Sequence, residues 1–514
     1  MQKYLQQLKN QKELTTVILG MLAFSFILVT TLNLTLSFLI FVVFIDLAIF
    51  QKSFHFGWIF SVLVIVILPT VYIADNLVSV GEIFTLVLAF VGFGNLLFDK
   101  HKIKLFPLFY YWLGIIILGG ILILLGDNSV DVGKEINQIT LYQLIMVFVI
   151  YPIIIISFQY FFQTKKRLEK FFLIITAIGT GQALFGLLTR IFKWELVDGI
   201  GITGETFANL PMQNNFYQIT AFFGDKLFLQ LGDNVLATLL LITIPVTLGM
   251  WLMQKFNLST IAGLTQLQTN NFHLRKIIDS VFGDRKNEIS KIIDLKMPLR
   301  LKANRERFFL FLFIIQITAL IFTFSYMSLI ILGVGISIMG ILLREQKVIL
   351  ITLLLLLVFI MFLPGFESVS IIRQKTYLIT LWHDLRHRQN FSWFWQGLDE
   401  NWREQIYNSY LVIFSKFGLI GLGLFLSGLW QYFQEIRLAY LKSDGFERIW
   451  LVVILAVFIE FVLLGVFSNV LFVGPVALLF WLLYGALQNL KYNQIEFGLT
   501  ETRLNKTTLK KEPV

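Results

Sequence analysis

Apolar runs of membrane-spanning length recur from the beginning to the end of this chain. Most runs hold about 17–22 residues and are separated from the next by a short polar break, and this length suits a helix crossing the roughly 30 Å hydrocarbon core of a bilayer. Because lipid offers backbone groups no partners, such runs span as helices. The sequence predicts an all-α, polytopic membrane protein with about fourteen transmembrane helices, near 15–33, 34–50, 57–74, 80–98, 105–125, 141–162, 171–189, 235–253, 308–325, 327–343, 348–364, 409–433, 449–467 and 470–490.

Composition leaves little room for a large soluble domain. Of the 514 residues, 57% are apolar and 14% are charged, whereas soluble domains carry about 25% charged residues. The absence of cysteine excludes disulfides, thiol catalysis and thiolate metal sites. The expected organisation is a tail at 1–14, a membrane domain at 15–490 and a second tail at 491–514.

The polar breaks alternate between basic and acidic or mixed. Because Lys and Arg are retained in the cytoplasm, the basic breaks predict that both termini and the loop 254–307 are cytoplasmic. The loops 190–234 and 365–408 are then extracellular, and the second is the large loop between predicted helices 11 and 12. The net charge of +10 therefore reflects topology and does not predict nucleic-acid binding.

The cytoplasmic loop 254–307 carries eleven Lys/Arg and five Asp/Glu. Its segments Phe272–Phe282 and Glu288–Met297 have the pattern of amphipathic basic helices, which favours contact with anionic membrane lipids. A regulatory docking site is the alternative interpretation.

The extracellular loops combine arginine, aromatic and carboxylate side chains. Guanidinium groups bind phosphate oxygens in pairs, tryptophan rings stack on sugars, and a carboxylate can take a proton from a sugar hydroxyl. This combination suits a substrate with a phosphate, a sugar and a lipid, although each arginine alone could form an ordinary ion pair. The substrate-binding candidates in these loops are Arg190, Arg386, Arg388, Trp393, Trp395 and Arg403.

Several chemistries have no motif in this sequence. We find no phosphate-cradling or dinucleotide-binding glycine pattern, no zinc-binding helix motif and no nucleophile elbow. We therefore expect neither a cofactor nor a metal. His383 and His387 are four residues apart, but no third ligand accompanies them.

Asp46, Lys416 and Glu460 are charged residues inside the apolar runs, where charge is costly. Asp46 is near a predicted helix end and could reach the membrane interface. Lys416 and Glu460 lie in adjacent predicted helices, so they could form a structural ion pair; a functional role for Lys416 is the alternative.

The chain resembles the O-antigen ligase and O-antigen polymerase superfamily of bacterial surface-glycan enzymes. The most specific likeness is Asn408-Ser409-Tyr410-Leu411 followed by Phe417-Gly418-Leu419-Ile420-Gly421-Leu422, which is similar to the family's exit from its large loop. Weaker likenesses are Gly232–Ala237, Phe322–Ser325, Arg373 and Gly397-Leu398. The resemblance covers roughly residues 170–435.

Two positions depart from the family pattern. Tyr326 stands where the family has arginine after its Thr-x-Ser turn, and Tyr407 stands where it has the histidine of His-Asn. Lys416 falls where the family often has an acidic residue. These departures indicate a divergent branch that could act on teichoic acid or capsule of Gram-positive cells.

The resemblance implies an enzyme of the bacterial cell membrane. It would transfer a glycan from an undecaprenyl-diphosphate carrier to an acceptor hydroxyl on a glycan or glycolipid, without metal, as a polysaccharide polymerase or glycopolymer ligase of cell-wall biogenesis. Arg373 would hold the diphosphate, and Glu404, Glu400 or His383 would be the base. Tyr407, Asn408 and Lys416 join the substrate-binding candidates.

Two other classes remain open. A lipid-linked oligosaccharide flippase or transporter also fits fourteen helices, although such proteins usually show repeated halves, and none is visible here. A non-catalytic scaffold is the third.

Overall fold

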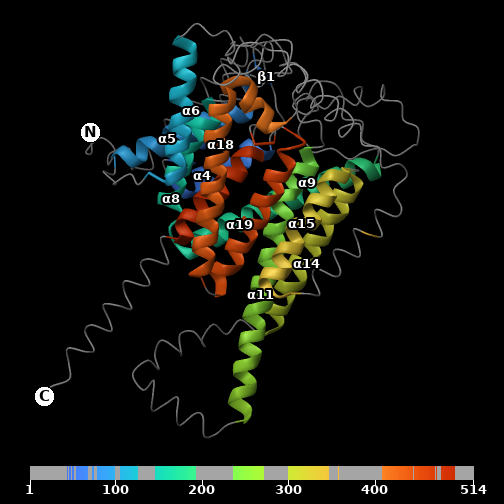
Figure 1. The fold of residues 1–514 in the computed structure, drawn as a ribbon. Coiled ribbons are helices and arrows are strands. Elements are labelled where there is room, and N and C mark those ends of the chain that lie inside the picture. The colour runs from blue at the N-terminus through green and yellow to red at the C-terminus, as the bar shows by residue number, and fades with distance from the viewer. Residues whose placement is uncertain are drawn as a thin grey trace, which may run out of the picture.

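The described part of the protein is a bundle of helices (Figure 1). The computed structural model describes residues 54–67, 72–73, 78–98, 105–124, 145–192, 235–270, 299–345, 408–471 and 476–491, except 324, 444 and 469, together with 43, 45–47, 49–50 and 357. The helices in chain order are α4 (Phe54–Ile67), α5 (Val80–Phe98), α6 (Pro107–Leu124), η2 (Met146–Ile150), α8 (Tyr151–Phe161), α9 (Lys165–Phe192), α11 (Val235–Asn270), α14 (Leu299–Phe322), α15 (Tyr326–Leu343), α18 (Ser409–Leu441), α19 (Gly445–Leu464) and, last, Val476–Lys491.

The all-helical prediction holds for the described residues apart from one short strand pair. Strand β1 (Tyr72–Ile73) pairs antiparallel with β2 (Val78–Ser79). The predicted helix 57–74 is therefore wrong at its end, since α4 is described over Phe54–Ile67 and Tyr72–Ile73 lie in a strand. The predicted helices 15–33 and 348–364, and most of 34–50, lie outside the described residues.

Three of the described helices contain a stretch long and apolar enough to cross a membrane. These stretches are Lys165–Leu188 in α9, Leu236–Lys255 in α11 and Ser409–Leu441 in α18. Shorter apolar helices lie beside them, among them Met327–Leu343 and Val476–Lys491. Their length and composition agree with a helical membrane protein.

Several helices are longer than the apolar runs that predicted them. Helix α9 begins at Lys165 instead of 171, α11 continues to Asn270, α14 begins at Leu299 and α18 continues to Leu441. Lys, Arg, Glu and Gln are good helix formers, so a helix continues past the residue where its sequence turns polar. The loop predicted at 254–307 is thus helical at both ends. Its predicted amphipathic helices, Phe272–Phe282 and Glu288–Met297, lie outside the described residues.

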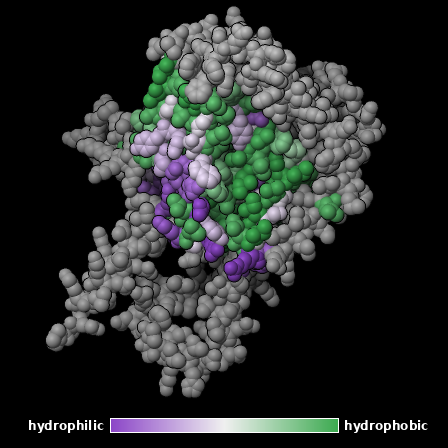
Figure 2. Space-filling model, viewed as in Figure 1, coloured by the Kyte–Doolittle hydropathy of each residue, from purple (hydrophilic) through white to green (hydrophobic). Residues whose placement is uncertain are grey.

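Described charged side chains gather at one end of this bundle. Lys255 of α11 pairs with Glu345 after α15 at 2.9 Å, and Lys165 of α9 lies 4.1 Å from the ring centroid of Phe446 in α19. At the same end, the Tyr440 hydroxyl of α18 donates to the carbonyl of Leu342 in α15 at 3.4 Å. Figure 2 shows hydrophilic side chains toward the lower end of the described surface and hydrophobic ones above them. We call this the basic end and the opposite one the apolar end.

A polar cluster links α9, α11 and α14 inside the bundle. The Gln316 amide of α14, fully buried, donates to the Thr180 hydroxyl of α9 at 2.8 Å and to the Thr247 hydroxyl of α11 at 3.1 Å. Interhelical hydrogen bonds of this kind help to hold helices together in lipid. Beside the cluster, α9 and α11 approach so closely that a Cβ built at Gly179 would lie 2.2 Å from the Thr243 hydroxyl oxygen.

We expect Gly179→Ala to destabilise the protein by about 1–3 kcal/mol, the usual cost of forcing an extra methyl group into a packed contact. The reason is that Thr243 is short and branched and cannot swing away. Thermal unfolding of the purified protein in detergent measures the effect. The control is Gly181→Ala on the same helix, where a new Cβ meets nothing within 4 Å. Equal unfolding midpoints for the two variants would contradict the predicted close contact.

Candidate functional site at the start of helix α18

The candidate site begins with the residue that caps α18. Asn408 has extended backbone angles, and its side-chain oxygen accepts from the backbone N–H of Tyr410 at 2.8 Å and of Leu411 at 3.2 Å. This satisfies backbone donors that a helix start leaves without partners. The Asn408 amide nitrogen donates to the carbonyl of Val466 at 2.6 Å. Asn408 therefore fixes both the start of α18 and its position on the turn after α19.

The next two residues fasten α18 to the same turn. The Ser409 backbone N–H donates to the carbonyl of Gly465 at 2.9 Å, and its hydroxyl donates to the carbonyl of Ser468 at 2.8 Å. The Tyr410 hydroxyl donates to the carbonyl of Val462 at 2.7 Å. These bonds satisfy carbonyls at the end of α19. The segment that carries the closest family likeness is thus a firmly anchored helix start at the apolar end.

A buried cation lies two turns below this anchor. Lys416 is only 4% exposed, although it follows an apolar helix start. Two residues later Gly418 takes φ 63° and ψ −164°, which breaks the helical geometry of α18. Side chains with a Cβ rarely adopt this conformation, so the glycine permits the break. A positive charge and irregular backbone at membrane depth are typical of a functional region.

The ion pair considered between Lys416 and Glu460 is wrong. Both carboxyl oxygens of Glu460 are buried and have no hydrogen-bond partner among the described residues. Asp46 is fully buried, and its carboxylate accepts a hydrogen bond from the Ser61 hydroxyl at 2.7 Å. Its position relative to the membrane interface stays a prediction. The positions of Asp46 and Glu460 along their helices did not predict which side chains surround them.

The structure describes three of the sequence-predicted site residues. Asn408 and Lys416 are described above, and Arg190 lies on α9, two residues before the helix ends at Phe192. Asn408 acts as a helix cap, which is a structural role in addition to any contact with substrate. The other candidates lie outside the described residues, namely Arg373, His383, Arg386, Arg388, Trp393, Trp395, Glu400, Arg403, Glu404 and Tyr407. In the described ranges no group of three or more His, Asp or Glu could hold a metal ion.

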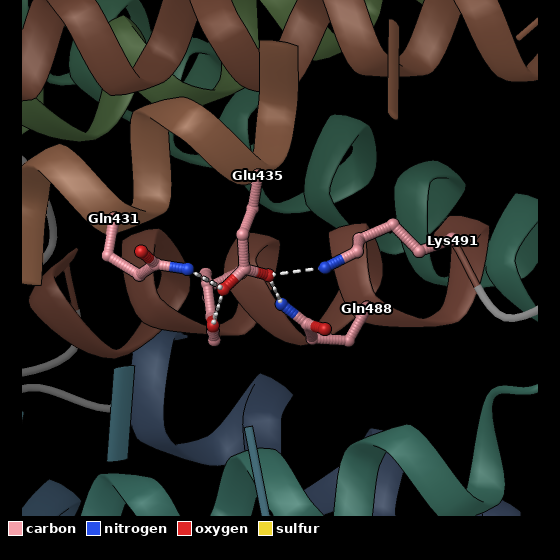
Figure 3. Close-up of polar contacts among 5 residues, drawn as sticks. Gln431, Glu435, Gln488 and Lys491 are labelled. Atoms are coloured by element: carbon pink, nitrogen blue, oxygen red, sulfur yellow. Dashed lines mark hydrogen bonds and ion pairs between the residues drawn. The ribbon is translucent and has the colours of Figure 1, made fainter. Parts of the chain in front are cut away.

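Sequence reasoning missed a second polar site, at the basic end. Figure 3 shows the Glu435 carboxylate of α18 surrounded by donors from α18 and from the helix Val476–Lys491. One oxygen accepts from Gln431 at 3.2 Å and from the Tyr484 hydroxyl at 3.1 Å. The other accepts from Lys491 at 2.7 Å and from the Gln488 amide. The i, i+4 spacing of Tyr484 and Gln488, with Lys491 three residues further, puts these donors on one helix face and was the available signal.

The Glu435 site has a structural role, because it holds α18 against the helix Val476–Lys491. Its carboxylate is 3% exposed and both oxygens are saturated with donors, so little acceptor capacity remains for a ligand. The apolar-end site, with a buried cation beside broken backbone, is the better candidate for chemistry. No protein-family model, no curated protein and no solved structure matches this chain.

Proposed function

We propose that this chain is a multi-pass protein of the bacterial cell membrane, with about fourteen transmembrane helices, that transfers a glycan on the outer face. The donor is an undecaprenyl-diphosphate-linked glycan, and the acceptor is a hydroxyl on another glycan or on a glycolipid. The reaction belongs to polysaccharide polymerases and glycopolymer ligases of the cell envelope. In this proposal the basic end faces the cytoplasm, as the positive-inside rule requires.

The observation that carries the proposal is the anchored start of α18 with a buried lysine beneath it. Lys416 is 4% exposed and lies about 12 Å along the helix from Asn408. A basic side chain retained inside a membrane protein commonly lies on a substrate pathway, and a lipid diphosphate carries its charge at the boundary between water and hydrocarbon. The loop 365–408, with its arginines and tryptophans, leads directly into this helix start.

The proposed reaction is a displacement at the anomeric carbon. The acceptor oxygen bonds to that carbon, the bond to the lipid diphosphate breaks, and the diphosphate leaves with the bonding electron pair. Arg373 holds the diphosphate and, with Lys416, stabilises its developing charge. Glu404, Glu400 or His383 takes the acceptor proton. Arg190, Arg386, Arg388, Arg403, Trp393 and Trp395 bind phosphate and sugar.

Deleting the gene tests the function as a whole. Short surface chains are the result expected of a lost polymerase, and long but unattached chains are expected of a lost ligase. Lipid-linked intermediates trapped on the inner leaflet would overturn the proposal in favour of a flippase. A flippase is the second candidate because Asp46 and Glu460 are carboxyls buried inside the bundle, and such groups often mark transport pathways.

We expect the loops 190–234 and 365–408 to face outward. Because the parent has no cysteine, Ser392→Cys supplies a single thiol in the loop 365–408. It should react with a membrane-impermeant maleimide on intact cells whose outer face is accessible. The control is a cysteine at Lys442, on the basic end, which should react only after the cells are opened. The reverse pattern would place the proposed chemistry on the wrong side of the membrane.

We expect Glu404→Gln to slow glycan transfer by at least about a hundredfold, which is the lower end of a general base's contribution. Tyr407→Phe should cost much less, because a phenol with an ordinary pKa of about 10 is a poor base near neutral pH. Transfer rates in membranes with matched amounts of each variant measure the difference. An active Glu404→Gln enzyme beside an inactive Tyr407→Phe enzyme would reverse the assignment, since Glu404 could instead pair with Arg403 or Arg386.

A further inference from the structure

Glu460 is an acid without a visible partner in the interior of the bundle. It lies on α19, is fully buried, and neither oxygen has a hydrogen-bond partner in the described structure. An ionised carboxylate in such surroundings is very costly unless it is paired. Glu460 is therefore protonated and neutral when α19 is packed as in this structure. Acids retained inside a membrane despite this cost commonly have a function.

The side of Glu460 that faces Gly335 leaves no space for a ligand larger than a proton. Helix α15 packs against α19 here, and a Cβ built at Gly335 would lie 1.7 Å from the Glu460 Oε1 atom and 2.5 Å from its Cδ. There is no room for a methyl group on this side, and a metal ion with its further oxygen ligands needs more space than that. The ligand that this contact can accept is a proton.

The surrounding helices offer Glu460 little charge compensation. Helices α11, α15 and α18 contact α19, and rings of Val476–Lys491 stack on it. Helix α9 contacts α19 near its start, where Lys165 lies over Phe446 and Phe172 stacks on Trp450, about four and three turns from Glu460. Residues 236–254 of α11 and 327–343 of α15 contain no titratable side chain. Tyr484 of the last helix donates to Glu435. From α18, Tyr410 donates to Val462, the Tyr432 ring contacts Phe458, and Lys416 does not hydrogen-bond to the acid.

We propose that Glu460 is a proton-binding site in the contact between α15 and α19. Release of its proton requires the two helices to separate locally, because the carboxylate must reach water or a cation. The proposal is independent of the proposed glycan transfer, and neither of its tests measures that activity. The close contact between α15 and α19 exists because residue 335 is a glycine. Loss of the Glu460 proton would open this contact.

Chemical labelling tests whether Glu460 is a protonated acid in an apolar environment. A hydrophobic carbodiimide adds to such an acid: the acid proton moves to a carbodiimide nitrogen, the carboxyl oxygen bonds to the central carbon, and nothing leaves. In membranes containing the full chain, the hydrophobic reagent reaches the acid from the apolar side when α15 and α19 separate locally. Mass spectrometry should then find the adduct at Glu460 with this reagent and not with a water-soluble carbodiimide. Glu460→Gln should lose this adduct. Equal labelling by both reagents, or an adduct at Asp46 and none at Glu460, would overturn the proposal.

Cysteine labelling tests whether proton release opens the contact. Ile336→Cys puts a thiol at a fully buried position of α15 beside Gly335. Its reaction with a membrane-permeant maleimide is compared in the Glu460 and Glu460→Gln backgrounds, so that the thiol's own ionisation cancels. The labelling rate with Glu460 divided by the rate with Glu460→Gln should rise with pH. The rise should be up to about tenfold per pH unit, because the ionised fraction of Glu460 rises by the same factor. A ratio independent of pH would refute the movement. Should Ile336→Cys not accumulate, Leu332→Cys, buried on the same helix, replaces it.

Discussion

Replacing Arg373 with alanine is expected to abolish glycan transfer while the protein still accumulates in the membrane. In the proposed reaction Arg373 holds the diphosphate of the carrier, and its planar guanidinium can bond two phosphate oxygens at once. Arg373→Lys should retain little activity, because an ammonium group cannot reproduce this paired geometry. Polymer output from membranes with matched protein amounts is the measurement.

The matched control for Arg373 is Lys375→Ala, which removes a positive charge two residues away in the same loop. This variant should keep most of its activity, because the prediction depends on paired phosphate bonds and not on the loop's total charge. Normal polymer output from Arg373→Ala would show that the family-based site is wrong. An equal loss from Lys375→Ala would indicate a general electrostatic effect.

Replacing Glu435 with leucine is expected to destabilise the protein by about 3 kcal/mol or more. The change removes the acceptor of four donors, and it leaves Tyr484, Gln488 and Lys491 without their carboxylate partner. Breaking one side of a buried charged network costs more than a surface ion pair contributes. Thermal unfolding in detergent, followed by the loss of folded protein after heating, measures the effect.

Two further variants separate the network from simple packing. Glu435→Gln keeps the shape and loses the charge, so it should be intermediate in stability. Gln434→Leu changes the neighbouring, half-buried position and should have a small effect. If Glu435→Leu were as stable as Gln434→Leu, the carboxylate would not be fastening α18 to the helix Val476–Lys491.

The sequence predicted where helices occur better than where they end. Apolar runs located α9, α11, α15 and α18 because burial in lipid or in the bundle selects apolar side chains along a whole helix. The ends of α11 and α14 were missed because helices continue through polar residues that favour helical geometry. The strand pair after α4 was missed because two residues per strand leave no periodic signal.

The candidate site was predictable in part. The pattern Asn408-Ser409 before an apolar run is a helix-start signal, and Lys416 is conspicuous inside that run. The separation of Lys416 from Glu460 was not predictable, because it depends on how α18 and α19 rotate about their axes. The Gln316 cluster was missed because threonines in apolar helices usually bond their own backbone, as Thr180 and Thr247 also do here.

The break at Gly418 divides α18 into two helical segments, or rods, that do not share one continuous hydrogen-bond ladder. The shorter rod, Ser409–Phe417, is fastened to the turn after α19 by Asn408, Ser409 and Tyr410. The longer one is fastened near its far end through Glu435 to a different helix. A continuous helix resists twisting because its hydrogen bonds join every turn to the next, and a non-helical residue interrupts that ladder. We therefore expect a rotation of Ser409–Phe417 to be transmitted only weakly across Gly418 to the contact at Glu435.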